Sequence, residues 1–142
     1  HYTIVTSGAN IAIELSQRSR STVSCVGGQI SSSTLSLSGP QAEAFLATVN
    51  IDTAVLAATG YSAGAGFTVG SYTENSLKRR VIQKADKVIL LIDRSKLGRT
   101  LPFTFASLSD IDVVICDAPL PEDFIQAARA AGTEVLQVQP AK

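Results

Sequence analysis

Apolar side chains follow two alternating patterns along the chain, and these predict strands and helices in turn. Short apolar or β-branched runs favour buried strands, whereas apolar residues three and four positions apart favour one face of a helix. The expected strands are 2–6, 22–26, 31–38, 51–58, 87–92, 113–116 and 134–138. The expected helices begin after Ser7, which can cap the first of them, and then at Pro40, near Thr73 and at Pro121.

This alternation predicts a fold class and the edge at which function is to be sought. Continuously apolar strands between helices predict an α/β fold with a mainly parallel sheet flanked by helices. In such sheets ligands bind beyond the carboxyl ends of the strands. The segments expected at that edge are 6–8, 27–28, 93–98, Asp117 and the glycine-rich stretch 59–70, which is expected to be a loop.

Length and charge narrow the class of protein. With 142 residues, 45% of them hydrophobic, the chain predicts one folded domain over residues 1–142. Its 12 basic and 12 acidic side chains cancel, whereas a domain that held DNA by itself would be basic. No apolar run is long enough to span a membrane, and no basic leader precedes an apolar stretch. We therefore expect no membrane segment, no signal peptide and no direct contact with DNA.

Residues that commonly bind metals or form disulfides are few. Cys25 and Cys116 each lie in an apolar run, and two isolated cysteines make neither a disulfide framework nor a zinc site. Both are expected to be small buried hydrophobic side chains. His1 is the only histidine in the sequence. The sequence therefore predicts no metal site, no cofactor and no catalytic residue.

Residues 60–64 match the G-x-S-x-G motif of α/β-hydrolases after an expected strand. That motif needs a helix directly after the serine, and Ala63 to Gly66 is a poor helix start. It also needs a histidine later in the chain, which the sequence lacks. The glycine spacing fits neither a dinucleotide fingerprint nor a P-loop. Serine hydrolase and nucleotide-binding chemistry are therefore disfavoured.

Two further segments have both a structural and a functional interpretation. The glycine-rich stretch is either a flexible turn or a loop whose backbone approaches a ligand, with Thr68 offering a hydroxyl. Glu74 and Lys78 are either a helix-supporting pair after a capping box or a polar pair that faces a ligand.

The loop 93–99 follows the most apolar strand and carries three cations. Such loops are commonly solvated, but this one lies at the expected ligand edge. A phosphate could be met by Lys96 as a point charge, or by one of the arginines as a fork.

Several short motifs follow one another in a recognisable order. They are Thr6-Ser7-Gly8, Val26-Gly27-Gly28, Leu37-Ser38-Gly39-Pro40-Gln41-Ala42, the strand 52–60, Gly66-Phe67-Thr68, Glu74 to Lys78, Asp93-x-Ser95-Lys96-x-Gly98 and the segment 108–117. In this order and spacing, from about Thr3 to Val138, the chain resembles the C-terminal effector-sensing domain of the DeoR family of bacterial sugar-operon repressors.

The resemblance implies an isomerase-like fold, similar to the ribose-5-phosphate isomerase/NagB-like fold, with a phosphosugar pocket at the sheet edge. The ligand-binding residues expected on this basis are Thr6, Ser7, Gly27, Gly60, Thr68, Glu74, Lys78, Asp93 and Lys96. The two lysines are expected to contact phosphate or hydroxyl groups. The two carboxylates are expected to accept hydrogen bonds from sugar hydroxyls or to orient the lysines.

The chain departs from the family pattern in two places. Ser7 stands where the family usually has asparagine. The family also has an earlier strand with a Gly-Thr-Thr loop, and a helix-turn-helix, which would both lie upstream of His1. We therefore expect a fragment of a longer regulator, with an incomplete pocket.

Three functions from different classes stay open. The first is the ligand-sensing and oligomerising part of a cytoplasmic repressor that is not an enzyme, binds a phosphorylated sugar or polyol, and contacts DNA through a separate helix-turn-helix. The second is a sugar-phosphate isomerase, although the turn 59–61 has no acid where such enzymes carry theirs. The third is a module that only holds subunits together, as a homo-oligomer.

Overall fold

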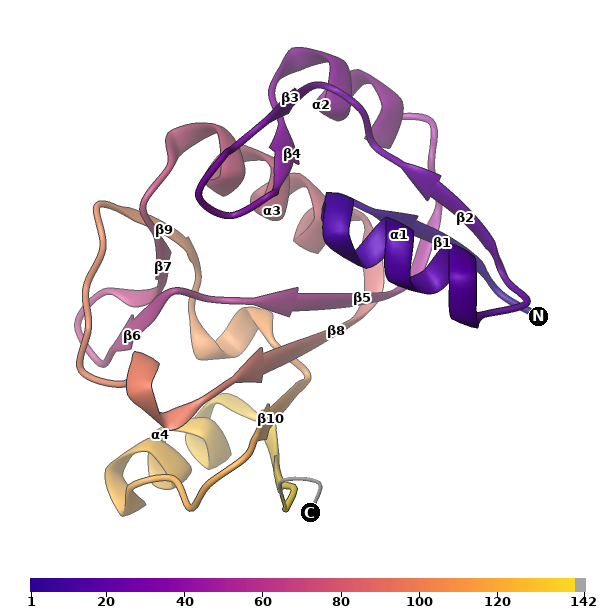
Figure 1. The fold of residues 1–142 in the computed structure, drawn as a ribbon. Coiled ribbons are helices and arrows are strands. Elements are labelled where there is room, and N and C mark those ends of the chain that lie inside the picture. The colour runs from indigo at the N-terminus through magenta and orange to yellow at the C-terminus, as the bar shows by residue number, and fades with distance from the viewer. Residues whose placement is uncertain (140–142) are drawn as a thin grey trace. The chain divides into compact units, whose positions relative to one another are not determined.

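The computed structural model describes residues 1–139, which form two compact units, residues 1–49 and residues 50–139. Each unit has its own sheets and helices (Figure 1). The single sensing domain expected over residues 1–142 stays a prediction. Within residues 1–139 no helix is long and apolar enough to cross a membrane.

The first unit is built on a parallel strand pair joined through a helix. Its elements are β1 (Thr3–Thr6), α1 (Ala9–Arg18), β2 (Thr22–Cys25), β3 (Gln29–Ile30), β4 (Leu37–Ser38) and α2 (Pro40–Leu46). β1 pairs with β2 in parallel, with Thr6 opposite Cys25. The proline at the start of α2 is where the sequence predicts it, because its fixed φ suits a first helical turn.

Three expectations for this unit are wrong. Gly8, not Ser7, is the N-cap of α1, and it offers no side-chain hydrogen bond. Residues 31–38 are not one strand, because β3 and β4 are two-residue strands separated by a turn. The Ser31 and Ser33 hydroxyls bond to each other, and the Ser31 N–H donates to the Ser36 carbonyl, so the segment closes a turn. Cys25 is exposed, whereas Cys116 in the second unit is buried as expected.

The second unit contains the predicted parallel sheet, in the strand order β11-β10-β8-β5. These strands are β5 (Ile51–Ala57), β8 (Ala85–Ile92), β10 (Val113–Cys116) and β11 (Glu134–Gln137). The helices α3 (Tyr72–Lys84) and α4 (Glu122–Ala131) pack on it. All of them lie within about two residues of the expected positions. The α/β fold with a mainly parallel sheet flanked by helices is therefore confirmed.

The helices of this unit cover one face of its sheet. Passing from β5 to β8, β10 and β11, the chain always steps in the same direction, and right-handed crossovers then fall on the same face. On β8 the alternation is clear: Val88, Leu90 and Ile92 are at most 5% exposed. On the other face Val55, Leu91 and Leu136 are 58%, 43% and 42% exposed.

The glycine-rich stretch is not the loop that the sequence predicts. It folds as the hairpin β6 (Gly60–Ser62) and β7 (Gly66–Val69), which pairs with β9 (Phe103–Ala106) in a small antiparallel sheet. Phe67 and Val69 anchor this sheet in the core, at 0% and 1% exposure. β9 was not expected at all, because the proline at 102 and the short segment after it give little periodic signal.

Candidate functional site

The carboxyl ends of β5 and β8 lie side by side, since Ala57 is paired with Leu91. The hairpin β6–β7 follows β5, and a short helical turn, η1 (Arg94–Lys96), follows β8 (Figure 1). The two segments are joined: Tyr61 bridges Leu97, and the Gly98 N–H donates to the Tyr61 carbonyl at 2.8 Å. The segments 59–70 and 93–98 of the predicted edge are thus connected to each other within the second unit.

Lys78 brings a positive charge to this edge. It lies on α3, and its Nζ donates a hydrogen bond of 2.8 Å to the carbonyl of Ala57, the last residue of β5. The ammonium also stands 5.3 Å from the centre of the Phe105 ring, in a cation–π contact. Burial lowers the pKa of the Lys78 ammonium, and the negative charge of Glu74 raises it in part. The group is therefore partly dehydrated, which strengthens its attraction for an anion.

Glu74 lies in the first turn of α3, four residues before Lys78. Its backbone N–H donates a hydrogen bond of 3.4 Å to the hydroxyl of Ser71, which caps the helix. The Ser71 cap expected from the sequence is therefore present, and the charge of Glu74 acts on Lys78. This arrangement places a carboxylate beside the Lys78 ammonium, which leaves the predicted ligand role of Glu74 untested.

Asp93 and Lys96 come together directly after β8. The Asp93 carboxylate caps η1 by accepting the Ser95 N–H at 2.9 Å, and it also accepts the Ser95 hydroxyl. The Lys96 Nζ lies 3.4 Å from Asp93 Oδ2. The Ser95 hydroxyl, together with the Ser95 N–H and the Lys96 ammonium, holds the pKa of the Asp93 carboxyl below its usual value against some desolvation. Asp93 therefore stays ionised and orients Lys96.

Gly60 and Thr68 are opposite each other in the hairpin and are both buried. The Thr68 hydroxyl accepts the Leu101 N–H at 3.0 Å, and the side chain is 0% exposed. A Cβ on Gly60 would come within 2.5 Å of the Arg99 carbonyl oxygen. Both residues thus hold the segment 99–101 against the hairpin, and a contact with ligand stays a prediction for each.

Thr6, Ser7 and Gly27 belong to the first unit, at the carboxyl ends of β1 and β2. The Val26 N–H donates to the Thr6 carbonyl at 3.1 Å, so the turns after the two strands are adjacent. The Thr6 hydroxyl accepts the Gly8 N–H at 3.1 Å. The structure therefore gathers these three predicted residues within the first unit and the other six within the second.

The serine of the hydrolase-like motif, Ser62, is hydrogen-bonded within the hairpin and to the segment that packs on it. Ser62 ends β6, and its hydroxyl accepts the Ala65 N–H at 3.2 Å and the Thr100 hydroxyl at 2.9 Å. The chain continues into a hairpin rather than a helix. The strained strand-to-helix turn of a serine hydrolase is therefore not formed here.

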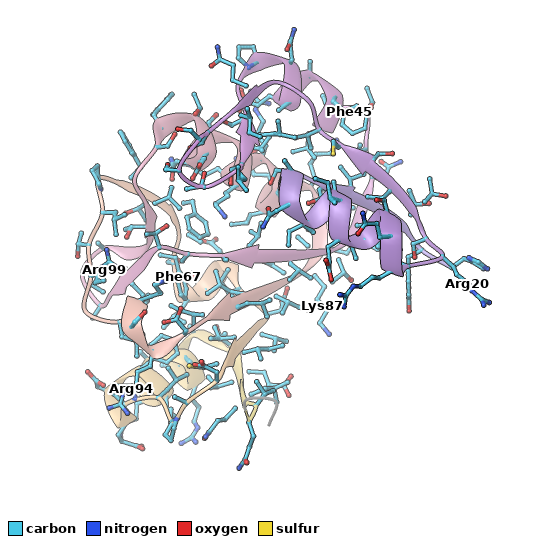
Figure 2. The ribbon with its side chains drawn as sticks, viewed as in Figure 1. Arg20, Phe45, Phe67, Lys87, Arg94 and Arg99 are labelled. Atoms are coloured by element: carbon cyan, nitrogen blue, oxygen red, sulfur yellow. The ribbon has the colours of Figure 1, made fainter. Side chains whose placement is uncertain are left out.

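Cations at this edge also point outward. Figure 2 shows Arg94 and Arg99 on the outside of the second unit, with Phe67 in its interior and Lys87 toward the opposite end of the sheet. A cavity of about 330 Å³ lies elsewhere, between α3 and β9, and includes Arg79, Gln83 and Ser107. None of the predicted site residues lines that cavity. Within residues 1–139 no group of three or more His, Cys, Asp or Glu side chains could hold a metal ion.

Two residues near the edge were missed by sequence reasoning. Tyr61 is buried against Phe67 and Phe124, and burial, with the charge of Asp123, raises the pKa of its phenol. Asn75 on α3 is 6% exposed, and its Oδ1 has no hydrogen-bond donor among the described residues. A polar residue in the first turns of a helix is common, so the sequence gives no signal for Asn75.

The known proteins that this chain resembles are transcriptional regulators or their sensor domains. A family model described as the DeoR C terminal sensor domain matches residues 1–118. The HTH-type transcriptional regulator GlpR of Haloferax volcanii is 36% identical over 132 residues, which cover 93% of this chain and 51% of that protein. The HTH-type transcriptional repressor GlcR of Bacillus subtilis is 31% identical over 134 residues, or 94% and 52% of the two chains.

A third relative bears the name of its regulon. The glycerol-3-phosphate regulon repressor of Escherichia coli is 28% identical over 123 residues, which cover 87% of this chain and 49% of that protein. The chain thus spans about half the length of the curated relatives it matches.

Proposed function

This chain belongs to the DeoR C-terminal sensor-domain family, and we propose that it senses a phosphorylated sugar or polyol for a transcriptional repressor. The observation that carries the proposal is the convergence of Lys78 and Lys96 on the carboxyl ends of two neighbouring strands. That edge is where open α/β sheets bind ligands. The name of the Escherichia coli relative supports a small phosphorylated polyol as one candidate class of effector.

Each charged group at this edge has a role in the proposal. Lys78 and Lys96 attract the phosphate as ammonium groups, and the partial dehydration of Lys78 strengthens that attraction. Asp93 keeps Lys96 in place and, with Glu74, accepts hydrogen bonds from hydroxyl groups of the ligand. Gly60 and Thr68 are proposed as residues that shape this edge. Thr6, Ser7 and Gly27, which belong to the first unit, stay predicted as ligand-binding residues there.

The proposed role in the whole protein is regulatory rather than catalytic. DNA would be bound by a separate helix-turn-helix domain, as the names of the relatives suggest. The cancelled charge of this chain suits such a division of labour in a cytoplasmic protein. An effector alters DNA binding if it binds one quaternary arrangement better than another.

Self-association is part of the same proposal. Parallel sheets are normally covered on both faces, and one face of this sheet carries Leu91, Ile115 and Leu136 in a single cross-strand row. Leu91 and Leu136 on it are exposed. A second copy of the chain would bury this row, which supports a homo-oligomer.

Charge reversal at Lys96 tests the proposal. In Lys96→Glu the ligand phosphate would meet two carboxylates, so we expect binding of the effector to weaken by about 100-fold or more. Lys87→Glu is the matched control, because Lys87 lies on the same strand-and-turn segment, near the opposite end of β8. Isothermal titration would give both affinities. Equal binding by Lys96→Glu and the wild type would refute the assignment.

A further inference from the structure

Asn75 is a buried polar side chain that the fold leaves unsatisfied. The residue is 6% exposed, and within residues 1–139 no donor is hydrogen-bonded to its Oδ1. Buried polar groups in native proteins nearly always have a partner, because an unpaired one costs free energy. The packing of the described residues does not explain this amide, and a partner from outside the chain would.

The position of Asn75 relates it to the charged edge. It is the fourth residue of α3, and its backbone N–H donates a hydrogen bond of 3.0 Å to the Ser71 carbonyl. It precedes Lys78 by three residues, so the two side chains lie on the same side of the helix. Lys78 reaches the end of β5 from there. Asn75 is thus one turn closer to the helix N-terminus, on the same side as the ammonium proposed to meet phosphate.

The chemistry of the group limits its partner. An amide oxygen accepts a hydrogen bond, and turning the amide over would present its NH₂ instead. A hydroxyl both donates and accepts, so it satisfies either orientation. A cationic partner is disfavoured by the neighbouring Lys78 ammonium. An uncharged hydroxyl group of a phosphorylated ligand fits both conditions.

We infer that Asn75 is a specificity-determining contact, whose side-chain amide binds one hydroxyl group of the phosphorylated effector. This inference rests on the proposed function and deepens it by assigning a second recognition element beside the phosphate. Because the Asn75 oxygen is covered, the side chains around it must move for the contact to form. A ligand with a hydroxyl at that position then binds more tightly than one without it, because the amide is otherwise left unpaired.

The test is a mutant cycle between Asn75→Ala and the hydroxyl groups of the ligand, in the intact protein. The probes are glycerol 3-phosphate with its two single-deoxy analogues, 2-hydroxypropyl phosphate and 3-hydroxypropyl phosphate, and glucose 6-phosphate with 2-deoxyglucose 6-phosphate. For a bound parent, we expect the wild type to bind one analogue about 10-fold more weakly. Asn75→Ala should lose a similar factor for the parent and nothing further for that analogue.

Gln83→Ala is the matched control, since Gln83 is an exposed amide on the same helix. It should bind every probe as the wild type does. The melting temperature of ligand-free Asn75→Ala should not fall, because the substitution removes an unpaired polar group.

The outcomes separate this inference from the proposed function. If the wild type bound none of the probes, nor any other phosphorylated sugar or polyol, both would fail. If the wild type bound a parent and Asn75→Ala distinguished its analogues as the wild type does, the inference alone would be overturned. A lower melting temperature of ligand-free Asn75→Ala with unchanged affinity would also overturn it, since Asn75 would then be structural.

Discussion

At the scale of single residues, two opposing effects act on the charged form of Lys78. Its hydrogen bond to the Ala57 carbonyl and its contact with Phe105 favour the charged form. Burial disfavours that form and lowers the pKa of the ammonium. The cost of burial is therefore present at pH values below the folded pKa, where Lys78 is charged in both states, and it disappears above the unfolded pKa. A bound phosphate would offset this cost.

Lys78→Met is the substitution that separates these effects. It keeps the length of the side chain and removes the charge, so we expect the ligand-free melting temperature near pH 7 to change by less than about 3 °C. Binding of the phosphorylated effector should weaken by about 10- to 100-fold, since a charge-assisted hydrogen bond is lost. Differential scanning calorimetry with and without effector would measure both quantities. An unchanged shift on adding effector would contradict the role given to Lys78.

Sequence reasoning located charged residues better than buried polar ones. Lys78, Glu74, Asp93 and Lys96 could be placed because strand ends and helical spacing put them at one edge. Asn75 could not, because whether an amide finds a partner depends on packing around it. Ser7 was expected to be the N-cap of α1, but Gly8 takes that position, and its N–H donates to the Thr6 hydroxyl.

At the scale of elements, the hairpin β6–β7 shows how glycine spacing can mislead. Many glycines in a short segment suggest a flexible loop, whereas here they permit close approach between strands and turns. Phe67 and Val69 alternate with glycine and threonine in too short a run for the pattern to be read as a strand. The long strands and α3 were predictable because their apolar patterns extend over more residues.

Gly60 and Gly64 form a matched pair for testing this account of the hairpin. A Cβ at Gly60 would approach the Arg99 carbonyl to 2.5 Å, so the backbone must move. We expect Gly60→Ala to destabilise the protein by about 2–3 kcal/mol. Gly64→Ala has nothing within 4 Å of its new methyl group and should be neutral or slightly stabilising. Urea unfolding of the two variants would decide; equal midpoints would contradict the packing role.

At the scale of the whole molecule, the hand of the crossovers determines which surfaces are free. Because every crossover of the second unit falls on one face of the sheet, the other face has no cover from those helices. This consequence follows from strand order, which the sequence alone did not provide. It also accounts for the exposed apolar residues on β5, β8 and β11.

Leu91→Glu tests whether a second copy covers this face. A carboxylate at the β8 end of the row should weaken self-association and shift the protein toward smaller species in sedimentation velocity. Ala127→Glu, on the exposed side of α4, is the control and should leave the distribution unchanged. The proposal of a homo-oligomer built on this face would fail if the wild type were monomeric at all concentrations, or if Leu91→Glu had no effect.

The most direct test of the central claim is thermal unfolding against a panel of phosphorylated sugars and polyols, with their unphosphorylated forms as controls. A ligand at about 100 times its dissociation constant adds about 2.7 kcal/mol of stability, or on the order of 5–10 °C for a chain of this size. We predict such a shift with one phosphorylated compound and none with its free form, and loss of the shift in Lys96→Glu. No shift with any phosphorylated compound, or equal shifts with the phosphorylated and free forms, would contradict a phosphate-sensing site.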